Sequence, residues 1–335
     1  MNLYSRFLTI LLTCQLSALL VGCQQTKQPP SLGSGKALNT FYDYYIQHSP
    51  SMERYSLLEL VDFSKDADVI FIGEYHSHSA SHKLQAELLS ALYAQRQQLV
   101  VSMEQFARNK QGTLNQYLSG EIGEQTLIRD GDAWDSYQSD YRSLVEFARE
   151  HNLPVIAANT PLSIVRCVSR KGPESLKLLG EEHKSWVAND IETSSLSYRE
   201  KFMQAMGGHR PNNNKRVVKL GNSFFAQLAR DNTMAESIYL AKKKFPNSQI
   251  IHINGAFHSN YHLGTVDALK RLAPELNVIV ISPHFLDEAM EWDKGDFVYT
   301  IKPIPARYVK KHNRDKAISR MMSKRKQSSC ELINE

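Results

Sequence analysis

Hydrophobic residues follow two alternating patterns along this chain. Short apolar runs rich in β-branched residues are typical of parallel strands buried on both faces. Between them lie longer stretches with helical spacing, such as the stripe of Leu84, Leu88 and Leu92. The predicted strands are residues 68–73, 99–104, 154–159, 249–254 and 277–282, and the predicted helices are residues 80–97, 111–118, 137–150, 161–170, 221–244 and 264–273. This alternation predicts an α/β fold with a central, mostly parallel sheet flanked by helices.

Two segments depart from the alternation. Residues 172–215 are polar, with aromatic residues and methionines scattered among charges, and they end in GGHRPNNNK. We expect them to form a helical cap inserted between two strands. Residues 296–301 (DFVYTI) are predicted to form a last strand, antiparallel at an edge of the sheet. The main domain is therefore expected over residues 41–305.

The N-terminus has the layout of an export signal. An apolar run from Phe7 to Val21 follows Arg6, and it is too short to span a bilayer. The tetrapeptide LVGC that ends at Cys23 resembles a bacterial lipobox. It predicts a signal peptide over residues 1–22 and a lipid on the Cys23 sulfur; an ordinary signal peptide followed by an unrelated cysteine is the alternative.

The residues after the cysteine predict where the protein is held. Residues 23–40 are rich in polar residues, Gly, Pro and Ser, and are expected to form a tether. Gln24 follows the cysteine, which favours the outer membrane over retention at the inner membrane. We therefore expect a lipid-anchored outer-membrane protein that faces the periplasm.

Charge is distributed unevenly along the chain. The net charge is +5, yet residues 306–335 hold nine Lys/Arg and three acidic residues, so the rest is nearly neutral. We expect a solvated, disordered basic tail, with contact to anionic lipid or a partner as the alternative. Nucleic acid is not an expected partner of an exported protein with this distribution. A disulfide between Cys167 and Cys330 stays open, since nothing in their spacing requires one.

Four of the predicted strands end in residues that can carry chemistry. In open α/β sheets, functional groups gather beyond the carboxyl ends of the strands. A buried strand that leads into a carboxylate is costly unless the charge is paired or lies in a cleft. The strand ends therefore predict one polar cleft. Its members are Glu74, His76, Glu104, Asn159, Asn254 and His258. The alternative is that each residue, taken alone, is a helix cap or a loop residue.

Other motifs are weak or absent. His78 and His82 have i,i+4 spacing, but the HExxH pattern is missing and solvent exposure explains both residues equally well. The chain has no GxxxxGK[ST], GxGxxG, GxSxG or CxxCH motif. These absences argue against a nucleotide site, a nucleophile elbow and covalently attached haem.

Six segments, in this order, resemble the ChaN family: IGEYHSHSASH, VSMEQFARNKQ with LNQYLSGE, YRSLVEFAREHNLPVIAANTP, YREKF with GGH, FFAQLARDNTMAES and IHINGAFHSNYHLG. The resemblance covers about residues 65–285. Members are bacterial haem-binding lipoproteins in a wider Tiki/erythromycin-esterase-like superfamily, and are associated with haem and iron uptake. The resemblance implies an α/β fold with a helical cap and ferric haem held by a tyrosine. It also implies a homodimer around two stacked haems, and an outer-membrane haem receptor or transport system as partner.

The resemblance extends to individual residues. Glu74, His76, Glu104 and His258 match a polar cleft that serves metal-dependent or esterase chemistry in relatives, and the RDxxMA block begins at Arg230, followed by Asp231. The chain departs from the family pattern by a tyrosine inside GEYH and by NGAFH in place of GxGH. Both changes are expected to add bulk at the floor of the cleft.

The haem ligand must be chosen among several tyrosines, since a phenolate suits ferric iron. Tyr198 lies in the expected cap, with Phe202, Met203 and Met206 at helical spacing. We predict Tyr198 as the axial ligand and His209 as its hydrogen-bonding partner or as a second ligand. The cations expected near the propionates are Arg199, Lys201 and Arg210, and the alternative ligands are Tyr75, Tyr137, Tyr141 and Tyr239.

The sequence thus supports three hypotheses. The first is a haem-binding outer-membrane lipoprotein of haem uptake. The second is a metal-dependent or acid/base hydrolase, in which the four cleft residues bind a divalent metal or activate water. The third is a lipid-tethered adaptor whose cleft has no activity.

Overall fold

A computed structural model describes residues 38–192, 196–206 and 214–327. The predicted signal peptide, Cys23 and most of the predicted tether lie outside the described residues, as do His209 and Arg210. The strands are β1 (Tyr44–His48), β2 (Arg54–Tyr55), β3 (Val69–Glu74), β4 (Leu99–Ala107), β5 (Val155–Asn159), β6 (Gln249–Gly255), β7 (Val278–Phe285) and β8 (Phe297–Ile301). The α-helices are α2 (Leu57–Phe63), α3 (Ser79–Gln95), α4 (Gln111–Leu118), α5 (Glu124–Asp130), α6 (Arg142–Glu150), α7 (Leu162–Lys171), α8 (Glu181–Lys184), α9 (Leu196–Ala205), α10 (Asn214–Lys244), α11 (Thr265–Leu272) and α12 (Lys311–Gln327).

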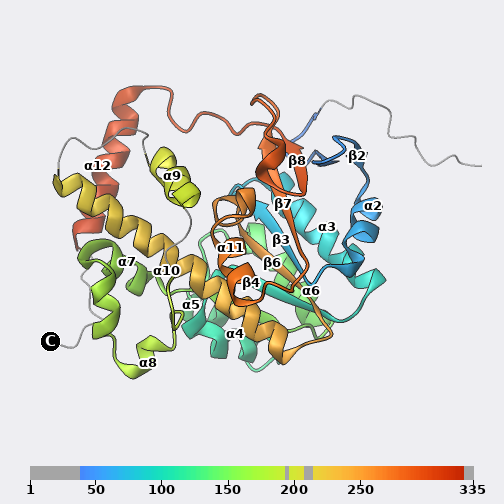
Figure 1. Ribbon diagram of the computed structural model, residues 1–335, viewed down its shortest axis with the longest axis horizontal. Helices are drawn as coiled ribbons and strands as arrows, with labels where there is room; N and C mark the ends of the chain where they lie inside the picture. The colour runs from blue at the N-terminus through green and yellow to red at the C-terminus, as the bar shows by residue number, and fades with distance from the viewer. Residues whose placement is uncertain (1–37, 193–195, 207–213, 328–335) are drawn as a thin grey trace, which may run out of the picture. The chain divides into compact units, whose positions relative to one another are not determined.

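The strands form one eight-stranded sheet in the order β2-β1-β8-β7-β3-β6-β4-β5 (Figure 1). From β8 to β5 all neighbouring strands run parallel. Only β1 and β2, at one edge, pair antiparallel. The predicted α/β fold with a mostly parallel central sheet is therefore confirmed.

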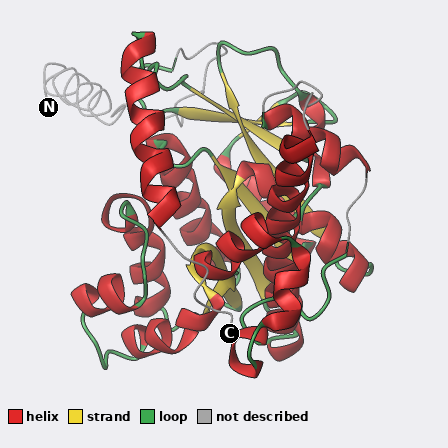
Figure 2. Ribbon diagram, turned by 90° about the vertical axis from the view of Figure 1, so that its left-hand side faces the viewer, coloured by secondary structure: helices red, strands yellow, loops and turns green. Residues whose placement is uncertain are grey.

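Helices cover both faces of the sheet (Figure 2). In β3, Ile70 and Ile72 point toward the core formed with α2 to α6, whereas Val69 and Phe71 point toward α10 and α11. All four side chains are fully buried. This burial on both faces is the reason that the strand reads as a continuous apolar run.

The last strand corrects one prediction. β8 is not an antiparallel edge strand, because it lies inside the sheet, parallel to β7 and antiparallel to β1. The strand β1 (YYIQH) was missed because only its central Ile46 is buried, which leaves little apolar pattern to recognise. Its pairing with β8 moves the edge of the sheet outward.

The predicted cap corresponds to the segment between β5 and β6. It contains a 3-10 helix over Pro173–Leu178, the short helix α8, and α9. The long helix α10 follows and contacts both α7 of the cap region and α11 on the sheet. Helix α10 therefore runs from the cap to the strand ends, and it carries Arg230 and Asp231.

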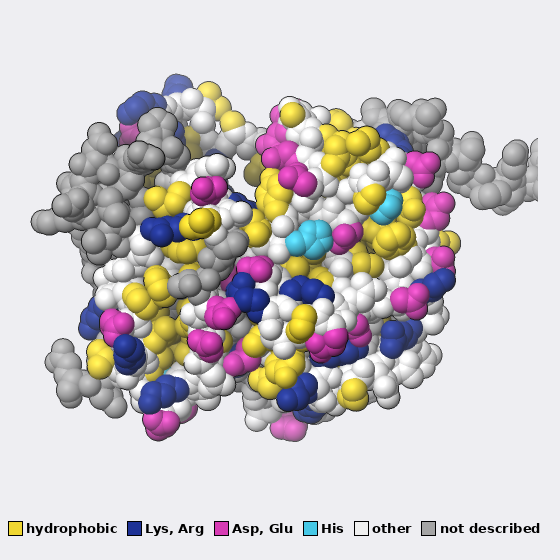
Figure 3. All heavy atoms as spheres, viewed as in Figure 1, with side chains coloured by type: hydrophobic (Ala, Val, Ile, Leu, Met, Phe, Trp, Pro, Cys, Tyr) yellow, Lys and Arg dark blue, Asp and Glu magenta, His cyan; other side chains and the backbone are white. Residues whose placement is uncertain are grey.

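The predicted basic tail is not wholly irregular, since residues 311–327 form helix α12. Basic and acidic side chains are interspersed on the domain face in Figure 3, in agreement with the near-neutral charge of the main domain. Within the described ranges, none of the helices combines the length and apolarity needed to cross a membrane. Cys167, in α7, is disulfide-bonded.

Candidate functional site

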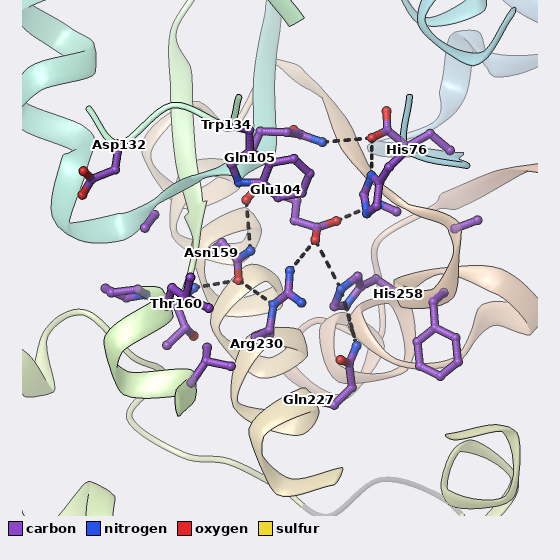
Figure 4. A pocket seen from close by; sticks show the side chains of 18 of the residues that line it. His76, Glu104, Gln105, Asp132, Trp134, Asn159, Thr160, Gln227, Arg230 and His258 are labelled. Carbon is purple, nitrogen blue, oxygen red and sulfur yellow. Dashed lines mark hydrogen bonds and ion pairs between the residues drawn. The ribbon is translucent and has the colours of Figure 1, made fainter. Parts of the chain in front are cut away.

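The sheet order brings the predicted strand ends together. β6 lies between β3 and β4, and β5 follows β4. In this register Gly255 lies beside Glu74, so a residue without a side chain separates the two carboxylates of β3 and β4. The strand ends thus leave a space between Glu74 and Glu104, and the predicted polar cleft occupies it (Figure 4).

Glu74 is buried and surrounded by hydrogen-bond donors. The Tyr141 hydroxyl donates to its Oε1 at 2.6 Å, and the Gln85 amide donates to its Oε2 at 2.6 Å. The same Oε1 lies 2.7 Å from Nδ1 of His76. Glu74 is only 1% exposed, and both of its carboxylate oxygens are hydrogen-bonded, so its position is fixed. Its hydrogen bond to Nδ1 therefore orients the His76 ring.

His76 is the histidine that reaches most freely into the cleft, since its side chain is 48% exposed. Burial disfavours its charge, but the hydrogen bond to Glu74 and the charges of Glu104 and Glu74 outweigh burial and raise the pKa of His76. A Cβ on Gly255 would lie 2.8 Å from the ring, so only glycine leaves room for it. Gly255 therefore sets the ring position of His76.

Glu104 is the charge at the centre of the floor. Arg230 donates to its Oε1, and the backbone N–H of Gly255 donates to its Oε2 at 2.6 Å. Nε2 of His258 lies 3.4 Å from Oε1. Burial alone would raise the pKa of Glu104, but the charges of His258 and Arg230 hold it well below its usual range.

His258 is held from its other side by Asp231. The distance from its Nδ1 to Asp231 Oδ1 is 2.6 Å, and Thr265 donates to the same oxygen. Burial opposes the charged ring, but the charges of Glu104 and Asp231 outweigh it and raise the pKa of His258 to about 9. His258 therefore carries a proton at neutral pH.

The third strand end has a structural part in the floor. The Asn159 amide donates to the backbone oxygen of Glu104 at 3.0 Å, and its oxygen accepts from Nε of Arg230 at 3.3 Å. Asn254, by contrast, bonds only locally, to the oxygen of Gly255 and to Ser259. Asn159 thus ties β5 to the Glu104–Arg230 pair.

These groups line a cavity of about 1090 Å³. Its wall includes the aromatic side chains of Tyr75, Trp134 and Phe257, and the aliphatic side chains of Leu162 and Val165. Ligand pockets of about 300–1,000 Å³ accommodate drug-sized molecules. The cavity is therefore large enough for a large organic ligand, with polar groups concentrated on the floor.

The structure gives Tyr198 a different position from the one predicted for a haem ligand. Its side chain is fully buried, and its hydroxyl donates to Asp231 Oδ2 at 2.6 Å. Burial and the charge of Asp231 raise the pKa of Tyr198 well above its ordinary value. In this structure Tyr198 does not line the cavity; it supports the carboxylate that orients His258.

Two of the cations predicted beside Tyr198, Arg199 and Lys201, do not line the cavity either. Nζ of Lys201 donates to the backbone oxygens of Phe257 and Asn260, and burial lowers the pKa of Lys201 to about 7. Arg199 is exposed and lies outside the cavity wall. Lys201 instead holds α9 on the loop that carries His258.

Among the alternative tyrosines, Tyr75 is the one that lines the cavity. Its ring stacks on Phe285, with 4.2 Å between centroids. Tyr137 and Tyr141 are buried in the core, and Tyr239 packs against the second core cluster. Tyr75 therefore replaces Tyr198 as the tyrosine best placed to meet a ligand.

His78 and His82, which were left out of the predicted site, are buried rather than exposed to solvent. Nδ1 of His82 lies 3.2 Å from Gln85 Oε1 and 3.4 Å from Glu74 Oε2. His78 accepts a hydrogen bond from Ala80 N at the start of α3. The available signal was the position of His82 and Gln85 on the apolar side of the predicted helix, where polar residues need buried partners.

The divalent metal of the hydrolase hypothesis gains no support from the side chains. Within residues 38–192, 196–206 and 214–327, no three His, Cys, Asp or Glu are grouped so as to hold a metal ion. The carboxylates and histidines of the floor instead pair with one another. The floor is therefore a network of paired acidic and basic side chains.

Fold and site together define an α/β protein with a cavity at the strand ends, in which two histidines held by carboxylates lie beside a central glutamate. The family model described as haem-binding uptake, Tiki superfamily, ChaN matches residues 60–269. The chain therefore belongs to the ChaN family, and the resemblance found in its sequence is confirmed.

A solved structure of the family shows the same fold. ChaN of Campylobacter jejuni, described for its cofacial haem binding, superposes with a TM-score of 0.62 at 15% identity, over 78% of this chain and 98% of that chain. A mutant of the erythromycin esterase EreC in its open conformation gives a TM-score of 0.44 at 13% identity, over 83% and 87%.

Part of a curated plant protein is similar to this chain in sequence. The chain is 24% identical over 222 residues to the chloroplastic protein RETICULATA-RELATED 5 of Arabidopsis thaliana. The match covers 60% of this chain and 29% of the plant protein. The chain thus spans less than a third of that relative.

Proposed function

We propose that this protein binds ferric haem in the cavity at the strand ends and acts in haem uptake as a lipid-anchored outer-membrane protein. Membership of the ChaN family supports haem as the ligand. The observation that carries the proposal is the tyrosine in the cavity wall, Tyr75. Its hydroxyl has no hydrogen-bond partner in the described part of the chain, and a phenolate is a suitable ligand for ferric iron.

The residues present fit a haem in outline. The cavity volume of about 1090 Å³ and the aromatic wall suit the porphyrin, and Tyr75 would hold the iron. When bound, the haem supplies a ferric centre that a phenolate can ligate. Burial and the charges of Glu288 and Glu291 raise the pKa of Tyr75 to about 12, so the phenol must give up a proton to ligate.

A haemin titration of the purified chain, followed by absorbance and size, tests the proposal. We expect a saturable spectrum of a tyrosine-ligated ferric haem and, if two haems bridge two chains, a doubling of the hydrodynamic size. A spectrum identical to that of free haemin at all ratios would contradict haem binding. An unchanged size with a saturated spectrum would remove the homodimer from the proposal.

Two matched variants identify the ligand. Tyr75→Phe keeps the ring that stacks on Phe285 and should remove the ligand band. Tyr198→Phe also removes one hydroxyl, yet it should leave the band in place. The reverse result would restore Tyr198, with His209 and Arg210, as the haem site.

The membrane anchor is tested separately in cells. Cys23→Ser should abolish labelling by radioactive palmitate and release the protein from the outer-membrane fraction on a density gradient. A variant that remains in that fraction without label would show that another part of the protein holds it there. Cross-linking to an outer-membrane haem receptor in the same cells tests the proposed partner.

A second function is favoured by the floor of the cavity. His76 and His258 are each held at Nδ1 by a buried carboxylate, and both rings lie beside Glu104 (Figure 4). Two histidines in one cavity can act as general base and general acid in a hydrolysis. One accepts a proton from the attacking water, and the other donates a proton to the leaving group. His76 is the more exposed ring and is placed for water, whereas His258 holds a proton at neutral pH.

Turnover of a panel of chromogenic esters tests this acid/base hydrolase. His76→Gln and Glu74→Gln should both abolish turnover. The first substitution removes the imidazole ring, and the second removes the carboxylate that holds this ring in place. Glu174→Gln, on the exposed 3-10 helix of the cap, is the control and should have no effect. Equal residual turnover in all variants would contradict the hypothesis, and stoichiometric metal by elemental analysis would revive its metal-dependent form.

A further inference from the structure

The segment after β8 reaches the cavity, although the sequence assigned its last part to the basic tail. Figure 1 shows this segment crossing from the end of β8 to α12. It is fixed where it starts, because the backbone oxygen of Lys302 lies 2.9 Å from Nε2 of the buried His78. Within it, Arg307 forms part of the cavity wall.

Two prolines stiffen the connection between this fixed point and Arg307. Pro303 and Pro305 alternate with other residues in the stretch KPIPAR. Each proline restricts its own φ to about −65° and disfavours helix for the residue before it. The arginine is therefore carried to the cavity by a short segment with few accessible conformations, at little entropic cost on ligand binding.

The other charged groups of the cavity wall are already paired. Glu74 is paired with His76, Glu104 with Arg230, and His258 with Asp231. Asp132 lies 2.7 Å from Nζ of Lys110. Every described charge in the wall except one thus has a partner of opposite sign.

Arg307 is the exception. Its side chain is exposed, and no hydrogen bond or ion pair joins it to any residue in the described ranges. An arginine offers a planar fork of donors that matches a carboxylate, with two parallel hydrogen bonds. A guanidinium in a cavity wall that has no partner in the described residues is suited to bind an anionic group of a ligand.

We propose that Arg307 binds a carboxylate of the cavity ligand. The inference rests on the proposed haem binding, in which the porphyrin propionates provide the carboxylates. It assigns a binding role to the start of the basic tail, where the fold leaves an arginine without a protein partner. Arg199 and Lys201, which were predicted for this task, do not line the cavity.

The test compares two ligands that differ only at the propionates. Haemin and haemin dimethyl ester are titrated into the whole chain, as wild type and as Arg307→Ala, Arg307→Lys and Arg314→Ala. Arg314 is an exposed arginine of α12 and controls for the general charge of the tail. The measured quantity is the ratio of the two dissociation constants for each protein.

We expect wild type to prefer haemin over its ester, and Arg307→Ala to weaken haemin binding about fivefold, the upper range for an exposed ion pair. The same variant should bind the ester as well as wild type does, so the preference disappears. Arg307→Lys should retain part of the preference, because it keeps the charge and loses the fork. Higher salt should reduce the wild-type preference.

An equal loss of affinity for both ligands in Arg307→Ala would overturn the inference, and so would an unchanged preference. A preference lost equally in Arg314→Ala would replace Arg307 with a diffuse effect of the tail. Absence of haemin binding in wild type would instead refute the proposed function. The two failures are therefore distinguishable.

Discussion

His258 should make the stability of this domain depend on pH in a defined direction. Its side chain is 5% exposed, and the charges of Glu104 and Asp231, acting against burial, raise its pKa to about 9. In the unfolded chain a histidine has a pKa of about 6.5. Between these values the folded protein binds one proton that the unfolded chain lacks. Stability from this group is therefore complete below pH about 6.5 and is lost as pH rises through about 9.

The size of the effect follows from the two pKa values. A shift from about 6.5 to about 9 corresponds to about 3 kcal/mol of unfolding free energy. His258→Gln removes the titrating group and keeps an amide that can donate to Asp231. In urea unfolding, the gap in stability between wild type and this variant should be about 3 kcal/mol larger at pH 6.5 than at pH 9.5. The comparison cancels the contributions of other titrating groups, such as Lys201.

His252→Gln is the matched control. His252 is also buried, but burial lowers its pKa to about 3, so it is neutral in the folded protein throughout this range. Its replacement should destabilise the protein by nearly the same amount at both pH values, with a difference of only about 0.4 kcal/mol because the unfolded histidine is half protonated at pH 6.5. The reasoning would be refuted if the difference in unfolding free energy between wild type and His258→Gln were also nearly the same at pH 6.5 and pH 9.5. That result would show that His258 is not charged in its site.

Three further predictions concern stability and ligand affinity. Ser56→Ala removes the cap of α2, whose hydroxyl accepts from Glu59 N, and should cost about 1 kcal/mol in urea unfolding; no loss would show that the capping box is dispensable. Arg230→Met leaves buried Glu104 with one cation fewer and should cost about 2–3 kcal/mol, discounted for the 24% exposure of the arginine; a loss below about 0.5 kcal/mol would mean that His258 and the Gly255 N–H suffice. Haemin affinity should rise about tenfold per pH unit between pH 6 and 8, because Tyr75 must lose its proton to ligate iron, whereas affinity independent of pH would argue against a phenolate.

Periodicity was sufficient for strands that are buried on both faces and for helices that bury one face. The strand predicted at 249–254 is β6 at Gln249–Gly255, and the helix predicted at 111–118 is α4 with the same bounds. In the strand every position meets the core, and in the helix the buried Leu114 and Tyr117 recur at helical spacing on one face. The half-exposed β1 lacks this constraint. Its absence from the prediction caused the misplacement of β8.

The site was partly predictable for a related reason. A carboxylate at the end of a buried strand has to be paired or to face a cleft, and both Glu74 and Glu104 do. The partners were less visible. Tyr141 and Gln85 come from two different helices, and neither has a local feature that marks it as a donor to Glu74.

By itself, the amino-acid sequence determined the α/β class, the strand ends that carry the polar floor, and membership of the ChaN family. These are local properties, because each depends on the pattern within one segment. Only the tertiary structure decided that Tyr198 supports Asp231, that Tyr75 lines the cavity, and that Arg307 returns from the tail to the wall. Whether a tyrosine or an arginine is free to bind a ligand depends on which distant groups pack against it. That choice is made by long-range burial and pairing of charges, which no single segment encodes.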